Sequence, residues 1–375
     1  MCHLSKPLYR LEASGHEDCR QEAGMSVEQF DAIVVGVGGH GSSAVYHLAK
    51  RGQKVLGIEQ FEIAHDRGSS HGESRIIRLA YHENPDYVPL LVRAYELWQK
   101  LQDECGQELL CVTGSVEAAS RNIDGKDKSV FRDALLAAQM HGLQHEVLSP
   151  AEANARFPGY HLPPDYEVLY QPQGGLLLVP ALQACATVQR NVIGWFGITE
   201  PGHFNKQRFP VYILQDGHAH FYGFPNYEHP GMKIGKFYHL QQKVLDPSRL
   251  DRNITAEDEE ELRVAVQDFF PTANGPLLKA AACMFTNTQD TRFVIDFHPA
   301  QPQVVLCSAC SGHGFKFCSV IGEILADLAM TSTTQHKIEA HRINPDRPGH
   351  HEFLQCAKRH TEEQVKNHHA PASHL

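Results

Sequence analysis

Residues 32–60 of the chain read AIVVGVGGHGSSAVYHLAKRGQKVLGIEQ. The stretch opens with four apolar residues, a length that suits a buried strand, and the following residues 36–41 fit the pattern G-x-G-x-x-G. Apolar side chains at helical spacing continue to Gly52, and a second apolar run, Val55–Ile58, ends at Glu59. A dinucleotide-binding unit has this order of strand, glycine turn, helix, strand and acidic residue. The acidic residue lies about 20 residues beyond the glycines, as it does here.

Each part of this unit has a physical role in holding a dinucleotide. Gly36, Gly38 and Gly41 let the backbone approach a pyrophosphate, which would bind the free N–H groups at the start of the helix. Glu59 would accept hydrogen bonds from a ribose hydroxyl. An isolated glycine motif is also compatible with a simple tight turn, but the complete unit favours a dinucleotide. It does not distinguish FAD from NAD.

Composition limits the other classes of function. A chain of 375 residues can form one large core or two domains, and 42% apolar and 21% charged residues are ordinary globular values. The net charge of −10 and the lack of a basic stripe predict no nucleic-acid partner. The lack of a long apolar run predicts no membrane partner. Ten cysteines do not make a dense disulfide framework in so long a chain, and 25 histidines occur without H-E-x-x-H. We therefore expect a reducing compartment and no metal site.

The rest of the chain alternates between helical and strand patterns. We predict helices over residues 85–105, 129–143, 182–188, 257–270 and 318–330, and strands over residues 111–118, 208–224, 232–238, 280–288, 293–296 and 304–306. Met25, just before the first strand, is an alternative start to Met1. Arg75 and Arg78 would share one face if their segment is helical, and their spacing fits an anion site and a solvated basic face equally well.

Further motifs follow the dinucleotide unit in a fixed order. They are RGSSHGESRIIR at 67–78, YGFP at 222–225, KIG at 233–235, CMFTNT at 283–288 and SGHGFK at 311–316. Together these motifs resemble the FAD-dependent amine oxidases of the monomeric sarcosine oxidase family, which includes peroxisomal sarcosine/pipecolate oxidases and N-methyltryptophan oxidase. The resemblance covers roughly residues 28 to 333.

The resemblance implies an α/β (α+β) protein of two domains, a Rossmann-like FAD-binding domain and a substrate domain with a mostly antiparallel sheet. We assign residues 28–82 with 145–188 and 283–333 to the FAD-binding domain, which is discontinuous and incomplete, and residues 83–144 with 190–282 to the substrate domain. A flexible extension at 1–27 and a flexible tail at 340–375, rich in Pro, His and charge, would flank them.

The resemblance also implies FAD as the cofactor, attached covalently through Cys283. From the residue type alone, a buried free thiol would be the commoner fate of such a cysteine. The other residues expected at the FAD are Gly36, Gly38, Gly41, Glu59, Ser70, His71, Arg75, Gly312, Gly314 and Lys316.

Two cations match the pair that binds the substrate's carboxylate in this family, Arg78 and Lys316. A small amino acid offers few other contacts, so a carboxylate between two cations supplies most of its orientation. Tyr81 and Tyr222 match active-site tyrosines, although the residue type alone would also suit a half-buried core position.

Lys233 matches the lysine that activates oxygen, because a fixed positive charge stabilises the negative charge that develops on O2. Without the motif we would expect a solvated lysine at a strand end. The family's active-site histidine has no clear match, since Phe237-Tyr238-His239 carries an insertion, and His239 is the nearest candidate.

The sequence departs from the family pattern in several places. Phe285 stands where a tyrosine is common, and Ala309 and Cys310 replace Gly and Phe before Ser311. The resulting C-x-x-C, residues 307–310, lacks a thioredoxin-like context, and we interpret it as chance. The largest departure is an internal deletion near residue 190, where the family has several tens of further residues, including strands of the FAD-binding domain. Their loss would expose sheet edges and unpaired backbone groups.

We therefore predict an FAD-dependent oxidase of small secondary amino acids, sarcosine-like N-methyl amino acids or L-pipecolate, that uses O2 and gives imine or aldehyde products and H2O2. The alternatives are a catalytically impaired truncated form and an NAD-dependent dehydrogenase, which would have no use for Cys283. The sequence leaves open the choice among sarcosine, pipecolate and N-methyltryptophan.

The last residues, Ser373-His374-Leu375, resemble a C-terminal S-K-L address. They predict a peroxisomal import receptor as a partner and the peroxisome as the location, with the cytoplasm as the alternative. Family members are often monomers, and we expect a monomer.

Overall fold

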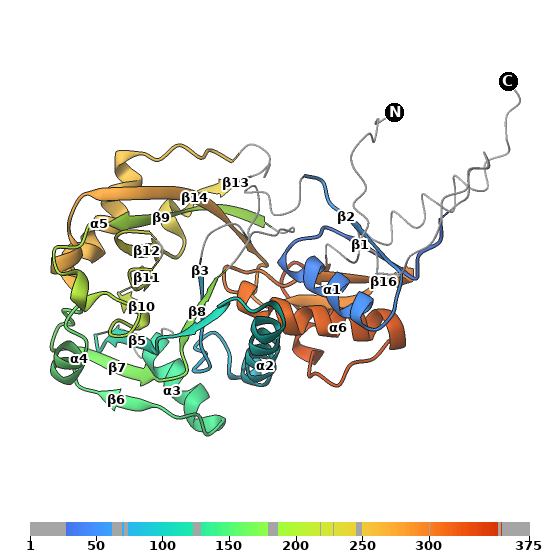
Figure 1. The fold of residues 1–375 in the computed structure, drawn as a ribbon, viewed down its shortest axis with the longest axis horizontal. Coiled ribbons are helices and arrows are strands. Elements are labelled where there is room, and N and C mark those ends of the chain that lie inside the picture. Colours follow the sequence, from blue (N-terminus) through green and yellow to red (C-terminus); the bar gives the residue numbers. More distant parts are fainter. Residues whose placement is uncertain are drawn as a thin grey trace, which may run out of the picture.

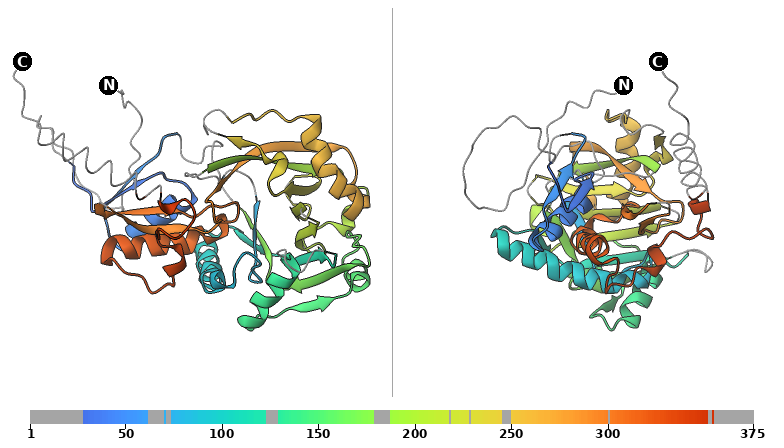
Figure 2. Two further views of the ribbon diagram at one scale, coloured as in Figure 1. Left: turned by 180° about the vertical axis from the view of Figure 1, so that it is seen from behind. Right: turned by 90° about the vertical axis from the view of Figure 1, so that its right-hand side faces the viewer.

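The computed structural model of the chain describes residues 28–61, 70, 74–122, 129–178, 187–217, 219–227, 229–244, 250–299, 301–351 and 354. Two bodies lie side by side in Figure 1, a large sheet with its helices on one side and the dinucleotide unit with the C-terminal helix on the other. The view from behind in Figure 2 shows the same division.

The dinucleotide unit has the predicted order of elements. It consists of β1 (Ala32–Val35), α1 (Gly39–Lys50) and β2 (Val55–Ile58). β1 and β2 are parallel, with Ala32 opposite Val55 and Val35 opposite Ile58. α1 buries Ala44, Val45 and Leu48, which recur at helical spacing, toward the core.

The second part of this body comes from the end of the chain. It contains the antiparallel pair β15 (Val294–His298) and β16 (Gln301–Ser308), followed by α6 (Cys318–Thr331), and α2 (Val88–Cys105) packs beside α6. A short 3₁₀ turn, Phe315–Phe317, leads into α6.

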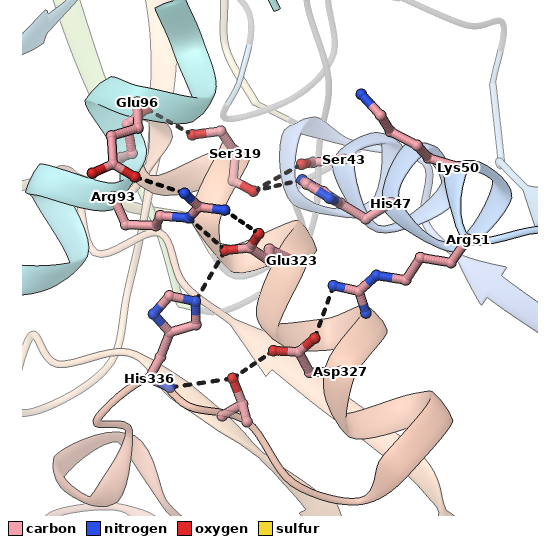
Figure 3. A network of polar contacts seen from close by, with 12 residues as sticks. Ser43, His47, Lys50, Arg51, Arg93, Glu96, Ser319, Glu323, Asp327 and His336 are labelled. Atoms are coloured by element: carbon pink, nitrogen blue, oxygen red, sulfur yellow. Dashed lines mark hydrogen bonds and ion pairs between the residues drawn. The ribbon is translucent and has the colours of Figure 1, made fainter. Parts of the chain in front are cut away.

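Polar contacts join the three helices of this body (Figure 3). Arg93 on α2 donates to both carboxylate oxygens of Glu323 on α6, at 2.9 and 2.7 Å, and His336 Nε2 lies 3.0 Å from the same carboxylate. From α1, His47 Nε2 lies 3.1 Å from the carbonyl oxygen of Ser319. The three helices therefore form one packed layer.

The strands of the dinucleotide-binding body form two separate pairs. Within the described ranges, β1 pairs only with β2, and β15 and β16 pair only with each other. α1 covers β1 and α6 covers β16, and the two helices touch so closely that a Cβ added to Gly322 would lie 2.1 Å from Ser43 Oγ. Packed helices lie about 8–10 Å apart, which is twice the spacing of neighbouring strands, about 4.8 Å. We infer that the space between β1 and β16 has the width of one further strand.

One face of the β1–β2 pair is also uncovered. Ile33, Val35 and Ile58 are 58%, 79% and 41% exposed, although parallel strands are usually buried on both faces. Open strands of this kind are the predicted consequence of the deletion near residue 190.

The large sheet is mostly antiparallel, as predicted. Its strands are β13 (Lys243–Val244), β9 (Thr187–Phe196), β12 (Met232–Lys236), β11 (Ala219–Phe224), β10 (Val211–Asp216), β5 (Ser115–Ser120), β7 (Tyr166–Gln171) and β6 (Glu146–Leu148) in this order, and β14 (Leu277–Asn287) pairs with β9. Among these pairings only β5 with β10 is parallel. Phenylalanine and tyrosine side chains from the sheet pack against α5 (Ala256–Phe269) in its largest apolar core.

Two further helices belong to this body, α3 (Val130–Met140) and α4 (Pro150–Arg156). A small sheet of β3 (Ser74–Ile77), β8 (Gly175–Leu178) and β4 (Leu110–Val112) lies between the two bodies (Figure 1). In the part of the chain that the structure describes, no helix is long and apolar enough to span a membrane.

Two local expectations need correction. Arg75 lies on strand β3, so Arg75 and Arg78 do not share a helix face. Of the helix expected over 182–188, residues 182–186 lie outside the described residues, and Val188 belongs to β9, where it pairs with Thr286. Cross-strand pairing with a distant segment overrides local preference there.

The ends of the chain fall largely outside the description. Residues 1–27 and 355–375, including the C-terminal tripeptide, are not among the described residues. Residues 340–351, the start of the predicted tail, pack on the body, where His341 and His350 are buried and Arg347 Nε lies 2.8 Å from Asp290.

Candidate active site

A cavity lies where the two bodies meet. It encloses about 950 Å³ of space that protein atoms do not fill, its open mouth included. Its walls come from the small sheet, from β11, β12 and β14 of the large sheet, and from the loop that precedes α6.

The cavity brings together many residues that the sequence predicted for the site. These are Ser70, Arg75, Arg78, Tyr222, Lys233, Cys283, Gly312, Gly314 and Lys316. Gly36, Gly38, Gly41 and Glu59 lie in the dinucleotide unit instead, and His71 is outside the described residues.

Two buried cations share one end of the cavity. The Arg78 guanidinium lies 4.6 Å, and Lys316 Nζ 5.2 Å, from the centre of the Tyr81 ring. Arg78 Nη2 is ion-paired with Glu83 at 2.7 Å. Lys316 Nζ donates to the carbonyl oxygen of His313 at 2.6 Å and, among the described residues, has no carboxylate within ion-pair distance. This end of the cavity is suited to an anion.

Burial and neighbouring charges shift the pKa values of Lys316 and Glu83. Loss of solvent lowers the pKa of Lys316 to about 7, although Glu83 acts to raise it. Burial acts to raise the pKa of Glu83, but Arg78 together with His82, His313 and Lys316 holds it well below its ordinary value. Glu83 is therefore ionised at neutral pH, and Lys316 is only partly charged.

The hydroxyl of Tyr81 is held by a hydrogen-bond chain. Tyr81 Oη lies 2.7 Å from His313 Nδ1, and His313 Nε2 lies 3.1 Å from the carbonyl oxygen of Thr291. A carbonyl only accepts, so Nε2 carries the proton and Nδ1 accepts from the hydroxyl. Burial lowers the pKa of His313 to about 4, and the ring is neutral.

Lys233 on β12 and Cys283 on β14 also line the cavity. Lys233 Nζ donates to Ser74 Oγ at 3.0 Å and lies 4.6 Å from the ring centre of Phe224. Burial raises the pKa of the Cys283 thiol, while Arg75 and Lys233 act to lower it. A thiol beside two cations is better able to react as a thiolate than one in an apolar site.

The dinucleotide turn adjoins this cavity. Gly36 has φ +84°, and a Cβ added to Gly41 would lie 1.9 Å from the carbonyl oxygen of Gly36, so both positions require glycine. Glu59 Oε2 accepts a hydrogen bond from the N–H of Val37 at 2.9 Å. His40, in the first turn of α1, lines the cavity. A dinucleotide on this turn could therefore extend into the cavity.

The predicted histidine does not reach the cavity. His239 is buried with its Nε2 2.9 Å from Asp258 Oδ1, and Asp258 also pairs with Arg190 at 2.7 Å. Phe237 lines the cavity instead, with its ring centre 4.9 Å from that of Tyr222. Strand alternation could have found Phe237, because residues 233, 235 and 237 lie on one face.

Three further polar residues at the site did not emerge from the sequence patterns. Glu83 lines the cavity, His313 holds Tyr81, and Glu117 lies behind Arg78 with its Oε1 3.8 Å from Arg78 Nε. The SGHGFK motif contains His313 and could have indicated it. Glu117 lies in a stretch without any motif.

Comparison with known proteins identifies a family. A family model described as FAD dependent oxidoreductase (DAO) matches residues 31–190 and 183–328. Monomeric sarcosine oxidase from a Bacillus species is 32% identical, with 84% of this chain and 97% of that protein aligned. Human peroxisomal sarcosine oxidase is 28% identical, with 84% and 96% aligned. The open form of NikD, an unusual amino acid oxidase, superimposes with a TM-score of 0.69 at 19% identity, covering 84% of this chain and 97% of that one.

The same comparisons bear on the deletion. The alignment with the Bacillus protein extends over 381 positions, whereas 84% of 375 residues is about 315, so roughly 65 positions have no counterpart in this chain. The two stretches that match the family model meet at residues 183–190. This agrees with the deletion predicted near residue 190 and with the missing strand of the dinucleotide-binding sheet.

Proposed function

The chain belongs to the monomeric sarcosine oxidase family of FAD-dependent oxidoreductases, and from this premise we propose that its substrate is a small secondary amino acid. The substrate would be an N-methyl amino acid or a cyclic one such as L-pipecolate, and O2 would be the electron acceptor. The enzyme class, a flavin-dependent oxidase acting on CH–NH donors, follows from the family; the choice of substrate is the proposal.

The pair of buried cations at one end of the cavity carries this proposal. Arg78 and Lys316 lie over the ring of the buried Tyr81, and together they would hold the substrate's carboxylate. Because Glu83 already occupies Arg78 Nη2, the carboxylate must replace it there. A ligand without an anionic group has no means to do so.

The residues present fit FAD. Gly36, Gly38 and Gly41 would hold the pyrophosphate and Glu59 the ribose. Ser70, His71, Arg75, Gly312 and Gly314 would surround the ring system, and Cys283 would attach to it covalently. FAD, when bound, would accept the hydride equivalent that leaves the carbon next to the amine nitrogen and would pass the two electrons to O2.

The chain's own residues would prepare the substrate for this step. The aromatic rings of Tyr222, Phe237 and Phe285 line one wall, which would exclude water and favour the neutral amine. Lys233 would hold a positive charge where negative charge develops on oxygen. Two electrons and two hydrogens from the substrate reduce O2 to H2O2, and water then hydrolyses the imine to an aldehyde and an amine.

Three finer features belong to the same proposal. We retain the peroxisome and its import receptor on the basis of residues 373–375, together with the peroxisomal relatives. We also retain the monomer and the division into two domains. The boundaries shift, because β6, α4 and β7, expected in the FAD-binding domain, lie in the large-sheet body, and α2, expected in the substrate domain, packs beside α6. We no longer propose a catalytic role for His239, because it contacts Asp258 and is not among the residues that line the cavity.

An absorption spectrum and a peroxide assay test the proposal. The purified full chain should be yellow, should stay yellow after acid precipitation, and should release H2O2 with sarcosine, L-pipecolate or N-methyltryptophan. L-Alanine, a primary amine, serves as the control. A colourless protein would support the impaired truncated form, and NAD-linked turnover that survives in C283A would support the dehydrogenase.

A further inference from the structure

Glu117 is a buried carboxylate that the proposed chemistry does not use. It lies on β5, between β7 and β10 in the large sheet, and it is 0% exposed. It is not among the residues that line the cavity. Its Oε1 lies 3.8 Å from Arg78 Nε, and within the described part of the chain neither of these two buried atoms has a hydrogen-bond partner. Arg78 therefore has Glu83 on its cavity side and Glu117 behind it.

Two unpartnered atoms that face each other inside a protein are costly, and a small movement of the guanidinium would pair them. Such a movement is blocked while Nη2 of Arg78 is held by Glu83 and Nη1 donates to the carbonyl oxygen of Ala80 at 2.8 Å. When a substrate carboxylate replaces Glu83, the guanidinium is released from one of these contacts. Glu117 Oε1 is then the nearest unpartnered acceptor among the described residues, and a carboxyl oxygen can accept from Nε whether the group is ionised or neutral.

The groups around Glu117 leave its charge poorly supported. The charged and titratable groups that act on it are Arg78, Glu83 and the hydroxyls of Tyr95 and Tyr160. Burial raises the pKa of Glu117 to about 7, even though Arg78 and a hydrogen bond from Ser115 act to lower it. Both protonation states are accessible at neutral pH.

We propose that Glu117 is a positioning residue for the substrate's carboxylate, which acts through Arg78 and takes up a proton when the carboxylate binds. The proposal rests on the proposed function, because it requires that Arg78 bind an anion. With Glu117 ionised, Arg78 already has one carboxylate behind it and attracts the carboxylate that replaces Glu83 only weakly. With Glu117 neutral, Arg78 keeps enough charge to hold the incoming anion. Binding and protonation are therefore linked.

The sign of the pH dependence follows. Glu117 and Lys316 both bind a proton below their pKa values, both about 7, and both then favour an anion in the cavity. Affinity for a carboxylate falls as the pH rises through 7. Each group that takes up one proton changes Kd by at most about tenfold per pH unit. Glu83, whose pKa Arg78 holds low, and His313, with a pKa of about 4, do not titrate in this range.

Titration calorimetry with acetate tests the proposal on the purified full chain. Measurements at pH 7 in buffers of different ionisation heat count the protons taken up, and Kd at pH 6, 7 and 8 gives the slope. E117Q should take up fewer protons than the wild type when acetate binds. The change of its Kd with pH should also be smaller, by up to tenfold per pH unit. E117D restores a titrating group and should recover part of the uptake.

The matched control is E323Q, which changes a buried, ion-paired glutamate on α6 that lies outside the cavity (Figure 3). The E323Q variant should be less stable than the wild type but should take up as many protons on acetate binding. If the role of Glu117 were merely structural, E117Q would behave in the same way. Acetate binding with equal proton uptake in wild type and E117Q would overturn the role of Glu117 alone. Absence of acetate binding in the wild type would overturn both this role and the carboxylate site.

If E117Q does not fold, proton uptake by Glu117 can be tested on the wild type alone. The infrared band of a protonated, buried carboxyl group should grow when ¹³C-labelled acetate is added at pH 7. Lysine has no such band, so Lys316 cannot produce it. A spectrum without this change would contradict the proposal.

Discussion

Arg78 Nη2 lies 2.7 Å from Glu83 Oε2, so the main cation of the cavity is already paired before any substrate arrives. Arg78 is almost wholly buried, and burial without a partner would disfavour its charge. Glu83 thus keeps the guanidinium charged and also competes with the substrate for it.

This competition predicts the effect of E83Q. The neutral amide holds Arg78 less strongly than the carboxylate, so a carboxylate ligand should bind more tightly, by about 1 kcal/mol or roughly fivefold. The measurement is KM for the best secondary amino acid, together with Kd for acetate. E96Q, which changes an exposed partner of Arg93, is the control and should alter neither value. An unchanged KM in E83Q would show that Glu83 does not compete.

Cys283 should determine whether the flavin is released by acid. In C283A the acid-precipitated protein should be colourless, and its intact mass should lack the flavin that the wild type carries. C111A removes another buried thiol, on β4 and outside the cavity lining, and should keep the attached flavin. A wild-type mass without any adduct would refute covalent attachment.

Lys233 should affect the reaction with oxygen and not the reaction with the amino acid. Its positive charge has no equivalent in K233M, so the rate constant for reaction with O2 should fall by about 100-fold or more. Anaerobic bleaching of the flavin by the substrate should keep its rate. Stopped-flow absorbance measures the two steps separately.

K279M is the matched control for this prediction. Lys279 Nζ lies 5.0 Å from the centre of the Trp195 ring, much as Lys233 Nζ lies 5.2 Å from it, but Lys279 is exposed and does not line the cavity. If K279M and K233M slow the oxygen step equally, the effect reflects general charge and not the site.

The missing strand predicts a gain of stability when it is restored. A chimera that carries the additional segment of the Bacillus relative between residues 188 and 191 should cover Ile33 and Val35 and pair the open edges of β1 and β16. We expect a higher Tm, by about 5 °C or more, since burial of such surface contributes a few kcal/mol. FAD should also bind more tightly.

Thermal unfolding and a fluorescence titration with FAD measure the two effects of this insertion. A Gly/Ser segment of equal length is the control, because it adds chain without a strand. A chimera no more stable than this control would show that the space between β1 and β16 does not accept the strand.

Much of the fold followed from local patterns. The dinucleotide unit was predictable because its strands, helix and glycine turn lie within 30 consecutive residues, and each is set by near neighbours in sequence. α5 and α6 were likewise predictable from apolar spacing. The strand at Val188 was not, because its partner Thr286 is almost a hundred residues away.

The site shows the same division. Its motifs marked Arg78, Lys233, Cys283 and Lys316 as a group, and the structure brings all four to one cavity. Strand alternation gives Phe237 and His239 the same direction, so the choice between them depended on where the strand ends. β12 stops at Lys236 and Tyr238 has φ +57°, and His239 after it contacts Asp258 instead of the cavity.

The sequence by itself determined the family, the glycine turn and the identity of the charged residues, because these depend on residue type and short spacing. Only the tertiary structure decided that Glu117 lies behind Arg78 and that, among the described residues, the open strand edges left by the predicted deletion belong to β1 and β16. Both depend on contacts between segments far apart in the chain, and β-sheet pairing, which brings such segments together, has no local pattern that reveals its partner.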